Sequence, residues 1–469
     1  MEPRINMAGG SLAGVLDRAR GLALGGDHLG TGMRMIRATA VIASVTLVVR
    51  FGGMVKELMV AGYFGRSDEL ETFLMALLLP NFIASIMAGG FSPAMIPVLV
   101  DLRLHYGKAD TQRLMSNAAC LAAGLLLAIT LLLALSAPYI LAVLCSGFSQ
   151  EKLQMTERIF YCLLPVLLIR GASTMWMDML NSGHKFALAS WAPLATSVST
   201  ALALLLLGST YGANALVVGF LAGALLEASL LAIALRRDGW SLLPRWHGMD
   251  QHLAAVIKQY WPGVASAILM GSGDIIDSGM AAMLPAGSVA ALGYGNKITS
   301  FVLGIGAASL MTAALPHLSA MAAKQRIAEM RIMLWRYVRL LLLVSVPLTL
   351  ALIACSKEIV ALLFQRGAFS ADDTAIVASV QAALLLQVPF FFISGFAVRF
   401  VMALRANHIM LWGTAICVVT NALGNYIFMT WFGVVGIAVS TAIVYAISAA
   451  YLLYMTSKLL DLREKEFSR

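Results

Sequence analysis

Apolar runs of about 18 residues or more recur along nearly the whole chain, and each is long enough to cross a hydrocarbon core of about 30 Å as a helix. The composition agrees with this pattern, because 60% of the 469 residues are hydrophobic and only 12% are charged. A soluble protein of this size carries about twice that charged fraction. The sequence therefore predicts an all-α, polytopic membrane protein.

Twelve spans are expected, with approximate bounds 36–62, 70–101, 114–145, 154–181, 187–207, 213–235, 257–284, 288–316, 332–355, 374–404, 409–430 and 434–457. Five regions follow from these spans: a tail at 1–34, a first lobe at 35–237, a linker at 238–256, a second lobe at 257–458 and a tail at 459–469. Lysine and arginine are concentrated in the connections on one side of the spans, together with both tails. This bias predicts cytoplasmic termini, so the net charge of +9 reflects topology and no nucleic-acid partner is expected.

The two halves of the chain resemble each other at a period of about 220 residues. Pro97 pairs with Pro316, while Pro165 and His184 match Pro389 and His408. Because six spans separate the copies, both copies have the same orientation, which is a parallel repeat about an axis along the membrane normal. The repeat predicts two pseudo-symmetric six-helix lobes around a central cavity.

One apolar segment, residues 71–103, contains three prolines and the Gly89-Gly90 pair. These residues are expected to interrupt the helix, and a helix that faces a cavity tolerates such breaks. A similar segment at residues 293–321 is the second copy. We expect both segments to be inner helices that line the cavity.

Several ionisable residues lie within the predicted spans, where each costs at least ~2.5 kcal/mol if it faces lipid near the bilayer centre. The candidate cavity residues are Arg50, Lys56, Glu57, Glu71, Arg170, Asn296 and Lys297. Ion pairs that hold a lobe together are the alternative for Arg50, Lys56 and Glu57, and Glu71 fits the start of a helix. Lys297 is a compact cation suited to phosphate. Asp178 and Glu227 have the pattern of structural residues.

Two acidic residues in the seventh span, Asp274 and Asp277, are three residues apart and therefore share a helical face. Two close carboxylates of this kind can bind a cation or a proton, which would couple transport to sodium ions, protons or the membrane potential. Hydrogen bonds between packed helices are the alternative role. No metal site or other cofactor is expected, since the five cysteines form no CxxC and the histidines lack metal-ligand spacing. No nucleotide motif or nucleophile–base pair appears, so an enzyme is not predicted.

Four segments carry a resemblance to a known family: VVRFGGMVKELMVAGYFG, ETFLMALLLPNFIASIMAGGFSPAMIPVLVDLR, GSVAALGYGNKITSFVLGIGAASLMTAALPHLS and LLFQRGAFSADDT. They resemble the MurJ/MviN family of lipid II flippases, which belongs to the multidrug, oligosaccharidyl-lipid and polysaccharide exporter superfamily. The resemblance implies a V-shaped pair of lobes in the bacterial cytoplasmic membrane. It implies alternating access that moves a polyprenyl-pyrophosphate-linked glycan, lipid II or an exopolysaccharide repeat unit, to the outer leaflet. The partners so implied are that glycan lipid, membrane lipid and cell-wall or polysaccharide polymerases.

The resemblance also carries over to individual positions. Arg50 falls on the family's first-helix arginine, Lys56-Glu57 on an Arg-Asp pair, Glu71 on an Asp, Asn296-Lys297 on an Asp-Arg pair and Asp277 on a polar position. Departures are Ala84 and Ser85 in place of basic residues, and Gly89-Gly90 in place of an acidic one. The sequence stops at Arg469, before two further helices of the family, so a shortened and divergent member is expected.

Two other functions fit the same residues. A cation-coupled exporter of small molecules or drugs would use the same scaffold, with Asp274 and Asp277 as the coupling groups. A membrane scaffold without transport activity would need no charge in the cavity.

Overall fold

The computed structural model describes residues 31–183 and 185–467, and the predicted tail at 1–34 therefore lies almost entirely outside the described residues. Every regular element of the described chain is an α-helix. The first half contains α2 (Thr31–Phe64), α3 (Asp68–His105), α4 (Lys108–Leu144), α5 (Gln150–Leu163), α6 (Pro165–Ser182), α7 (Phe186–Trp191), α8 (Leu194–Tyr211) and α9 (Ala213–Arg237). The second half contains α10 (Gln251–Ala281), α11 (Ser288–Ala323), α12 (Ile327–Ala354), α13 (Ser356–Phe364), α14 (Ala371–Leu385), α15 (Val388–Ala403), α16 (Asn407–Phe432) and α17 (Val434–Phe467).

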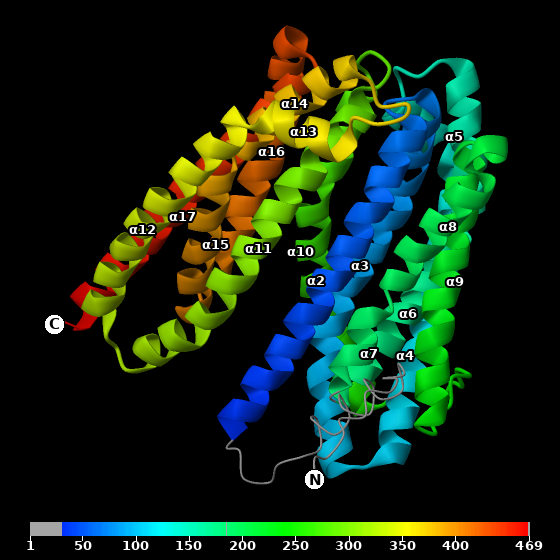
Figure 1. Ribbon diagram of the computed structural model, residues 1–469. Helices are drawn as coiled ribbons and strands as arrows, with labels where there is room; N and C mark the ends of the chain where they lie inside the picture. The colour runs from blue at the N-terminus through cyan, green and yellow to red at the C-terminus, as the bar shows by residue number, and fades with distance from the viewer. Residues whose placement is uncertain (1–30, 184, 468–469) are drawn as a thin grey trace, which may run out of the picture.

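Ten helical segments within the described chain are long and apolar enough to cross a membrane. Three of them combine consecutive helices, namely α5 with α6, α7 with α8, and α14 with α15. The remaining long helices, α2 with 34 residues and α11 with 36, run beside these segments in Figure 1. Together they correspond to the twelve predicted spans, and the all-α membrane fold is confirmed.

The match between Pro165 and Pro389 reappears in the fold. Each proline lies in the first turn of the second helix of a divided span, α6 in the first half and α15 in the second. Proline suits this position because the first amides of a helix have no partner within the helix. The two prolines therefore divide equivalent spans at equivalent places.

The two sets of helices converge at one end of the molecule and diverge toward the end where α2 begins and α17 ends (Figure 1). At the converging end, a single apolar core joins the halves and includes Phe64, Phe73, Tyr294, Phe364 and Phe369. At the other end the core is divided. Met95 and Leu99 belong to a cluster of the first-half helices that also includes Leu253 and Val256 of α10, whereas Phe392 and Phe400 belong to a cluster of the second half. The halves are therefore joined at the converging end and also along α10, which packs against the first half.

The expected interruption of the segment 71–103 is wrong, since α3 is a continuous helix of 38 residues with three prolines inside it. Prolines are tolerated in membrane helices because neighbouring helices and local adjustments satisfy the freed backbone groups. The glycine pair has a packing role instead. A Cβ atom at Gly263 of α10 would lie 2.9 Å from the Gly90 Cα, and one at Gly90 would lie 3.0 Å from the Tyr260 ring. Glycine therefore allows α10 to lie directly against α3.

The connection between the halves is shorter than the predicted linker at 238–256, because α10 already begins at Gln251. The Asp250 side chain caps this helix by accepting a hydrogen bond of 2.7 Å from the Leu253 amide. The residues before it lie along α4, where Asn117 accepts from the His247 amide and donates to the Gly248 carbonyl oxygen. The connection is thus fixed to the first half.

Candidate functional site

A pocket of about 670 Å³ lies between the two halves. Its wall comes mainly from α2, α3, α6, α8 and α9 of the first half, and α11 of the second half closes one side. The volume is within the range of about 300–1,000 Å³ that is common for ligand sites. The pocket is therefore a candidate substrate site, and its chemistry depends on the polar side chains of the wall.

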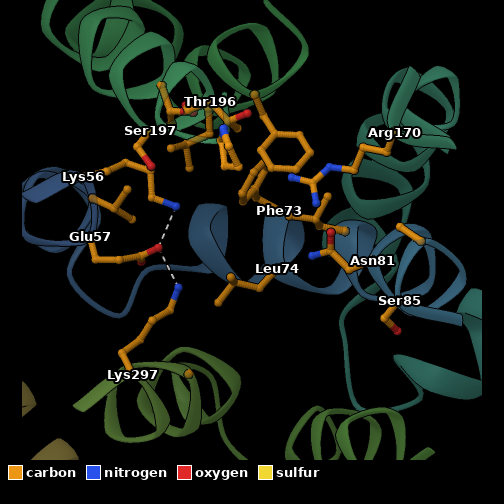
Figure 2. Close-up of a pocket in the computed structure, with 18 of the residues that line it drawn as sticks. Lys56, Glu57, Phe73, Leu74, Asn81, Ser85, Arg170, Thr196, Ser197 and Lys297 are labelled. Atoms are coloured by element: carbon orange, nitrogen blue, oxygen red, sulfur yellow. Dashed lines mark hydrogen bonds and ion pairs between the residues drawn. The ribbon is translucent and has the colours of Figure 1, made fainter. Parts of the chain in front are cut away.

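Three charged side chains meet on one side of this pocket. Glu57 Oε1 accepts hydrogen bonds from Lys56 Nζ and from Lys297 Nζ, each at 2.6 Å (Figure 2). Lys56 and Glu57 are neighbours on α2, whereas Lys297 belongs to α11, so this group joins the two halves. Two ammonium groups share one carboxylate, which leaves the triad Lys56–Glu57–Lys297 with one net positive charge. All three residues line the pocket, and their role in substrate binding stays a prediction.

A second group of polar residues lies across the pocket. The Arg170 guanidinium of α6 lies over the Phe220 ring, 5.0 Å from its centroid, a distance typical of a cation–π contact. Glu227 of α9, whose sequence pattern resembles that of a structural residue, also lines the pocket and accepts a hydrogen bond of 2.9 Å from Thr196 Oγ1. Figure 2 shows Arg170 on the side of the pocket away from Lys56 and Lys297. Arg170 could be predicted from the sequence because it is a charged residue in the middle of a span. Phe220 could not, because an apolar residue in a span does not indicate a site.

The α3 wall contributes no charged side chain to the described lining of the pocket. Ala84 and Ser85, the positions where the family carries basic residues, both line it. The Ser85 hydroxyl donates a hydrogen bond of 2.7 Å to the Phe82 carbonyl oxygen and is therefore already engaged. The positive charge of the pocket comes from α2, α6 and α11.

Three predicted cavity residues, Arg50, Asn296 and Glu71, lie outside this lining. Arg50 is on α2 but its guanidinium lies against Gly304 of α11, where a Cβ atom would overlap Arg50 Nη1. Asn296 is exposed, and its side-chain oxygen accepts a hydrogen bond of 3.2 Å from Ser300 Oγ. Lys297 lines the pocket, whereas Asn296 is not part of the described lining.

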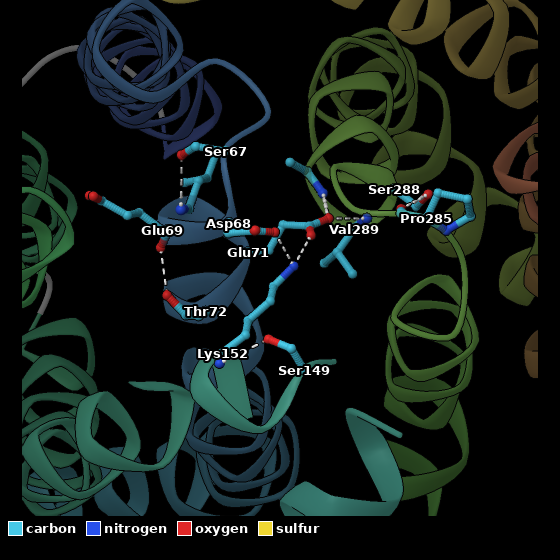
Figure 3. A network of polar contacts seen from close by, with 12 residues as sticks. Ser67, Asp68, Glu69, Glu71, Thr72, Ser149, Lys152, Pro285, Ser288 and Val289 are labelled. Carbon is cyan, nitrogen blue, oxygen red and sulfur yellow. Dashed lines mark hydrogen bonds and ion pairs between the residues drawn. The ribbon is translucent and has the colours of Figure 1, made fainter. Parts of the chain in front are cut away.

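Glu71 lies at the converging end of the molecule and is only 1% exposed. Its Oε1 atom accepts hydrogen bonds of 2.7 Å from the Val289 amide and 3.2 Å from the Ala290 amide, in the first turn of α11. Lys152 of α5 donates to both Glu71 and Asp68 (Figure 3). Glu71 lies in the first turn of α3, as its expected preference for a helix N-terminus implies, and its carboxylate also bonds to the first turn of α11 in the other half.

A second contact between the halves lies at the same end. Arg66, in the turn before α3, forms an ion pair of 2.7 Å with Asp373 of α14. The Ala368 amide donates a hydrogen bond of 2.8 Å to the Gly62 carbonyl oxygen. These contacts and those of Glu71 close the converging end of the pocket.

Asp277 is away from the pocket, where α10 meets α16 and α17. It accepts hydrogen bonds from Asn425 Nδ2 at 2.6 Å and from Thr441 Oγ1 at 3.4 Å. Asn425 Nδ2 also donates to Asn421 Oδ1, while Asn425 Oδ1 is buried and has no partner in the structure. Asp274, one turn away, is exposed. The described residues contain no group of three or more His, Cys, Asp and Glu side chains placed to hold a metal ion.

The paired bundles and the charged pocket between them define a polytopic transporter. Solved structures share this fold. A lipid II flippase MurJ in an inward closed conformation has a TM-score of 0.76 at 20% identity, covering 89% of this chain and 87% of that chain. An inward-facing multidrug resistance transporter of the MATE family also has a TM-score of 0.76, at 12% identity, with 91% and 99% covered.

The sequence itself identifies the family. The family described as Lipid II flippase MurJ matches residues 60–469, and the chain belongs to this family. Among similar relatives, a probable lipid II flippase of Synechocystis sp. is 26% identical over 435 residues, which are 89% of this chain and 80% of the relative. One of Rickettsia prowazekii is 24% identical over 415 residues, or 88% and 82% of the two chains.

Proposed function

We propose that this protein is a flippase that moves a polyprenyl-pyrophosphate-linked glycan from the inner to the outer leaflet of the bacterial cytoplasmic membrane. The observation that carries the proposal is the triad Lys56–Glu57–Lys297, which gives the pocket between the halves a net positive site. The names of the relatives, probable lipid II flippases, support a substrate of this class. Lipid II and an exopolysaccharide repeat unit both present the required pyrophosphate, and a cell-wall or polysaccharide polymerase would receive either product.

The triad is suited to exchange an internal carboxylate for a phosphate. Lysine ammonium groups act as mobile point charges, and charge-assisted hydrogen bonds to phosphate are about twice as strong as neutral ones. An incoming pyrophosphate would compete with Glu57 for Lys56 and Lys297. Because these lysines lie on α2 and α11, a bound pyrophosphate would join the two halves within the pocket.

Alternating access would follow from the arrangement of the two ends. Opening the converging end requires the loss of the Glu71 hydrogen bonds to α11 and of the Arg66–Asp373 ion pair. At the other end α10 shares a core with the first half, while α12 and α15 belong to a separate core, so the helices beyond α10 would move as a body around the site. We propose that both termini are cytoplasmic, so that the conformation described here would receive substrate from the cytoplasmic side.

The Asp277 cluster is the proposed coupling site. Asp277, Asn421, Asn425 and Thr441 bring oxygen atoms from three helices together, and oxygen donors suit hard cations such as sodium, as well as protons. Binding there would change the contacts among α10, α16 and α17 and so bias the position of the second half. Asp274, exposed one turn away, would add negative charge near this site.

The function is tested by depletion in the native host. Depletion should cause lipid-linked glycan precursors to accumulate at the inner leaflet, and the chemistry of the accumulated glycan would identify the substrate. A depleted strain in which no lipid-linked precursor accumulates at the inner leaflet would contradict the proposal. Reconstituted protein should move a labelled polyprenyl-pyrophosphate disaccharide across vesicles, and Lys297→Ala should do so at least tenfold more slowly.

A cation-coupled exporter of small molecules is the second candidate, favoured by the Asp277 cluster and by the fold shared with a MATE transporter. It predicts that overexpression raises drug resistance and that Asp277→Asn abolishes the gain. An unchanged resistance profile would count against it.

A further inference from the structure

The pocket has two polar regions with different states of charge. In the triad, both ammonium groups are already bonded to the Glu57 carboxylate. Arg170 has no carboxylate within ion-pair distance in the described part of the chain, and its Nε atom is buried without a hydrogen-bond partner. The guanidinium instead rests on the Phe220 ring. A planar cation that is fixed in orientation but not paired is prepared to bind an anion.

The hydroxyl groups beside Arg170 are engaged within the protein. Ser173 and Thr174 donate to the carbonyl oxygens of Ile169 and Arg170, each at 3.0 Å. Thr196 donates to Glu227, which satisfies part of that carboxylate. Their protons are therefore unavailable to a ligand. Within the described lining, the donors left on this side are the Arg170 guanidinium and the exposed side-chain amide of Asn81.

This donor set discriminates among anions. A guanidinium presents two parallel N–H groups that match the two oxygens of a carboxylate. The negative charge of Glu227 acts on Arg170 and offsets its charge, so the region as a whole does not favour a polyanion such as pyrophosphate. A single carboxylate fits it better. The triad, which keeps one net positive charge after Glu57 is counted, fits the pyrophosphate.

We propose that Arg170 is a specificity-determining residue that binds a carboxylate carried by the head group of the substrate, while the triad binds the pyrophosphate. This inference rests on the proposed flippase function. The carboxylate can come from an acidic sugar of the glycan or from a peptide attached to it. In both cases the head group would extend across the pocket from Lys56 and Lys297 to Arg170, as the positions in Figure 2 allow.

The test compares three synthetic lipids with the same polyprenyl-pyrophosphate, bound to the purified protein in lipid nanodiscs. One carries a neutral disaccharide, one a disaccharide with a uronic acid, and one the neutral disaccharide with a short carboxylate-bearing peptide. The unmodified protein should bind at least one acidic lipid about tenfold more tightly than the neutral one, since a hydrogen bond to a charged group is typically worth about that much. The preferred acidic lipid distinguishes a sugar carboxylate from a peptide carboxylate.

Arg170→Gln should abolish this preference and leave the affinity for the neutral lipid unchanged, which also shows that the variant is folded. Arg170→Lys, which keeps the charge over Phe220, should retain part of the preference. Glu227→Gln is the matched control and should keep or increase it. Equal binding of all three lipids by the unmodified protein, or an equal loss of all three in Arg170→Gln, would overturn the assignment. If the unmodified protein binds none of them, the proposed function fails and the assignment fails with it.

Discussion

Lys56 and Lys297 donate to the same oxygen atom of Glu57, each at 2.6 Å, although 241 positions separate them in the chain. The Lys297 side chain is 39% exposed and the Lys56 side chain is 24% exposed, so the ammonium on α11 is the more accessible of the two to a ligand. This asymmetry makes Lys297 the first residue to test.

Lys297→Ala should lower transport at least tenfold while the amount of protein in the membrane stays the same. The change removes the more exposed cation and leaves Glu57 paired with Lys56, so the triad loses its net positive charge. Lys297→Arg should retain most of the activity because it restores the charge. Transport by reconstituted protein, with membrane abundance measured in parallel, checks this. Loss of the protein from the membrane would instead indicate a structural ion pair.

Glu71→Ala should favour opening of the converging end. The substitution removes two hydrogen bonds to the first turn of α11 and leaves Lys152 with only Asp68 as its carboxylate partner among the described residues. Breaking a buried pair by removing one partner costs about 3–5 kcal/mol, so the closed conformation should lose much of its advantage. The measurement is labelling of a cysteine placed at Ser197, on the pocket wall, by a membrane-impermeant maleimide added outside.

That labelling requires a background in which the five natural cysteines are replaced. The control is Glu69→Ala, because Glu69 accepts from the Ala213 amide within the first half and, among the described residues, makes no hydrogen bond or ion pair to the second half. It should leave labelling unchanged. Equal labelling of Glu71→Ala and the unmodified chain would show that Glu71 does not hold this end closed.

Asp277→Asn should make transport independent of the coupling ion. The amide can still accept from Asn425, so the packing of α10 against α16 should survive, but the charge that attracts a cation is lost. Transport measured with and without a sodium gradient, and at several pH values, identifies the ion that the unmodified protein uses. Asp274→Asn should have a smaller effect, because Asp274 makes none of these hydrogen bonds. Unaltered ion dependence in Asp277→Asn would rule out this residue as the coupling group.

Gly263→Leu should destabilise the protein by about 1–3 kcal/mol or more, the typical cost of overpacking. Its side chain would enter the contact where α10 lies against Gly90 of α3. Gly124→Leu is the matched control, since a Cβ atom there meets nothing within 4 Å. Thermal unfolding in detergent compares the two, and a similar melting temperature for both variants would contradict the close packing of α3 and α10.

Much of the fold could be predicted from the sequence because a long apolar run indicates directly that the segment lies in lipid. The spans, the repeat and the proline positions all depend on local composition or on comparison of the chain with itself. The charges of the triad were identifiable for the same reason, since a cation within a span has few tolerable environments.

The contacts across the chain were not predictable in this way. Lys152 has the sequence pattern of a residue in an outer connection, yet it pairs with Glu71 on another helix. The partners of Glu71 are backbone amides, which every residue has and no composition reveals. The Gly89-Gly90 pair illustrates the same difficulty. A glycine that permits close packing and a glycine that breaks a helix look alike until the neighbouring helix is known.

The single apolar core at the converging end has a consequence for the energy supply of the cell. A pocket large enough for sugars would conduct ions and water if it opened to both sides at once, and the membrane potential would collapse. Because aromatic side chains from both halves fill that end, the described conformation is sealed by hydrocarbon, which excludes hydrated ions. Selection would then keep Phe64, Phe73, Phe364 and Phe369 because they make the protein impermeable to ions. A transport assay alone does not measure this property.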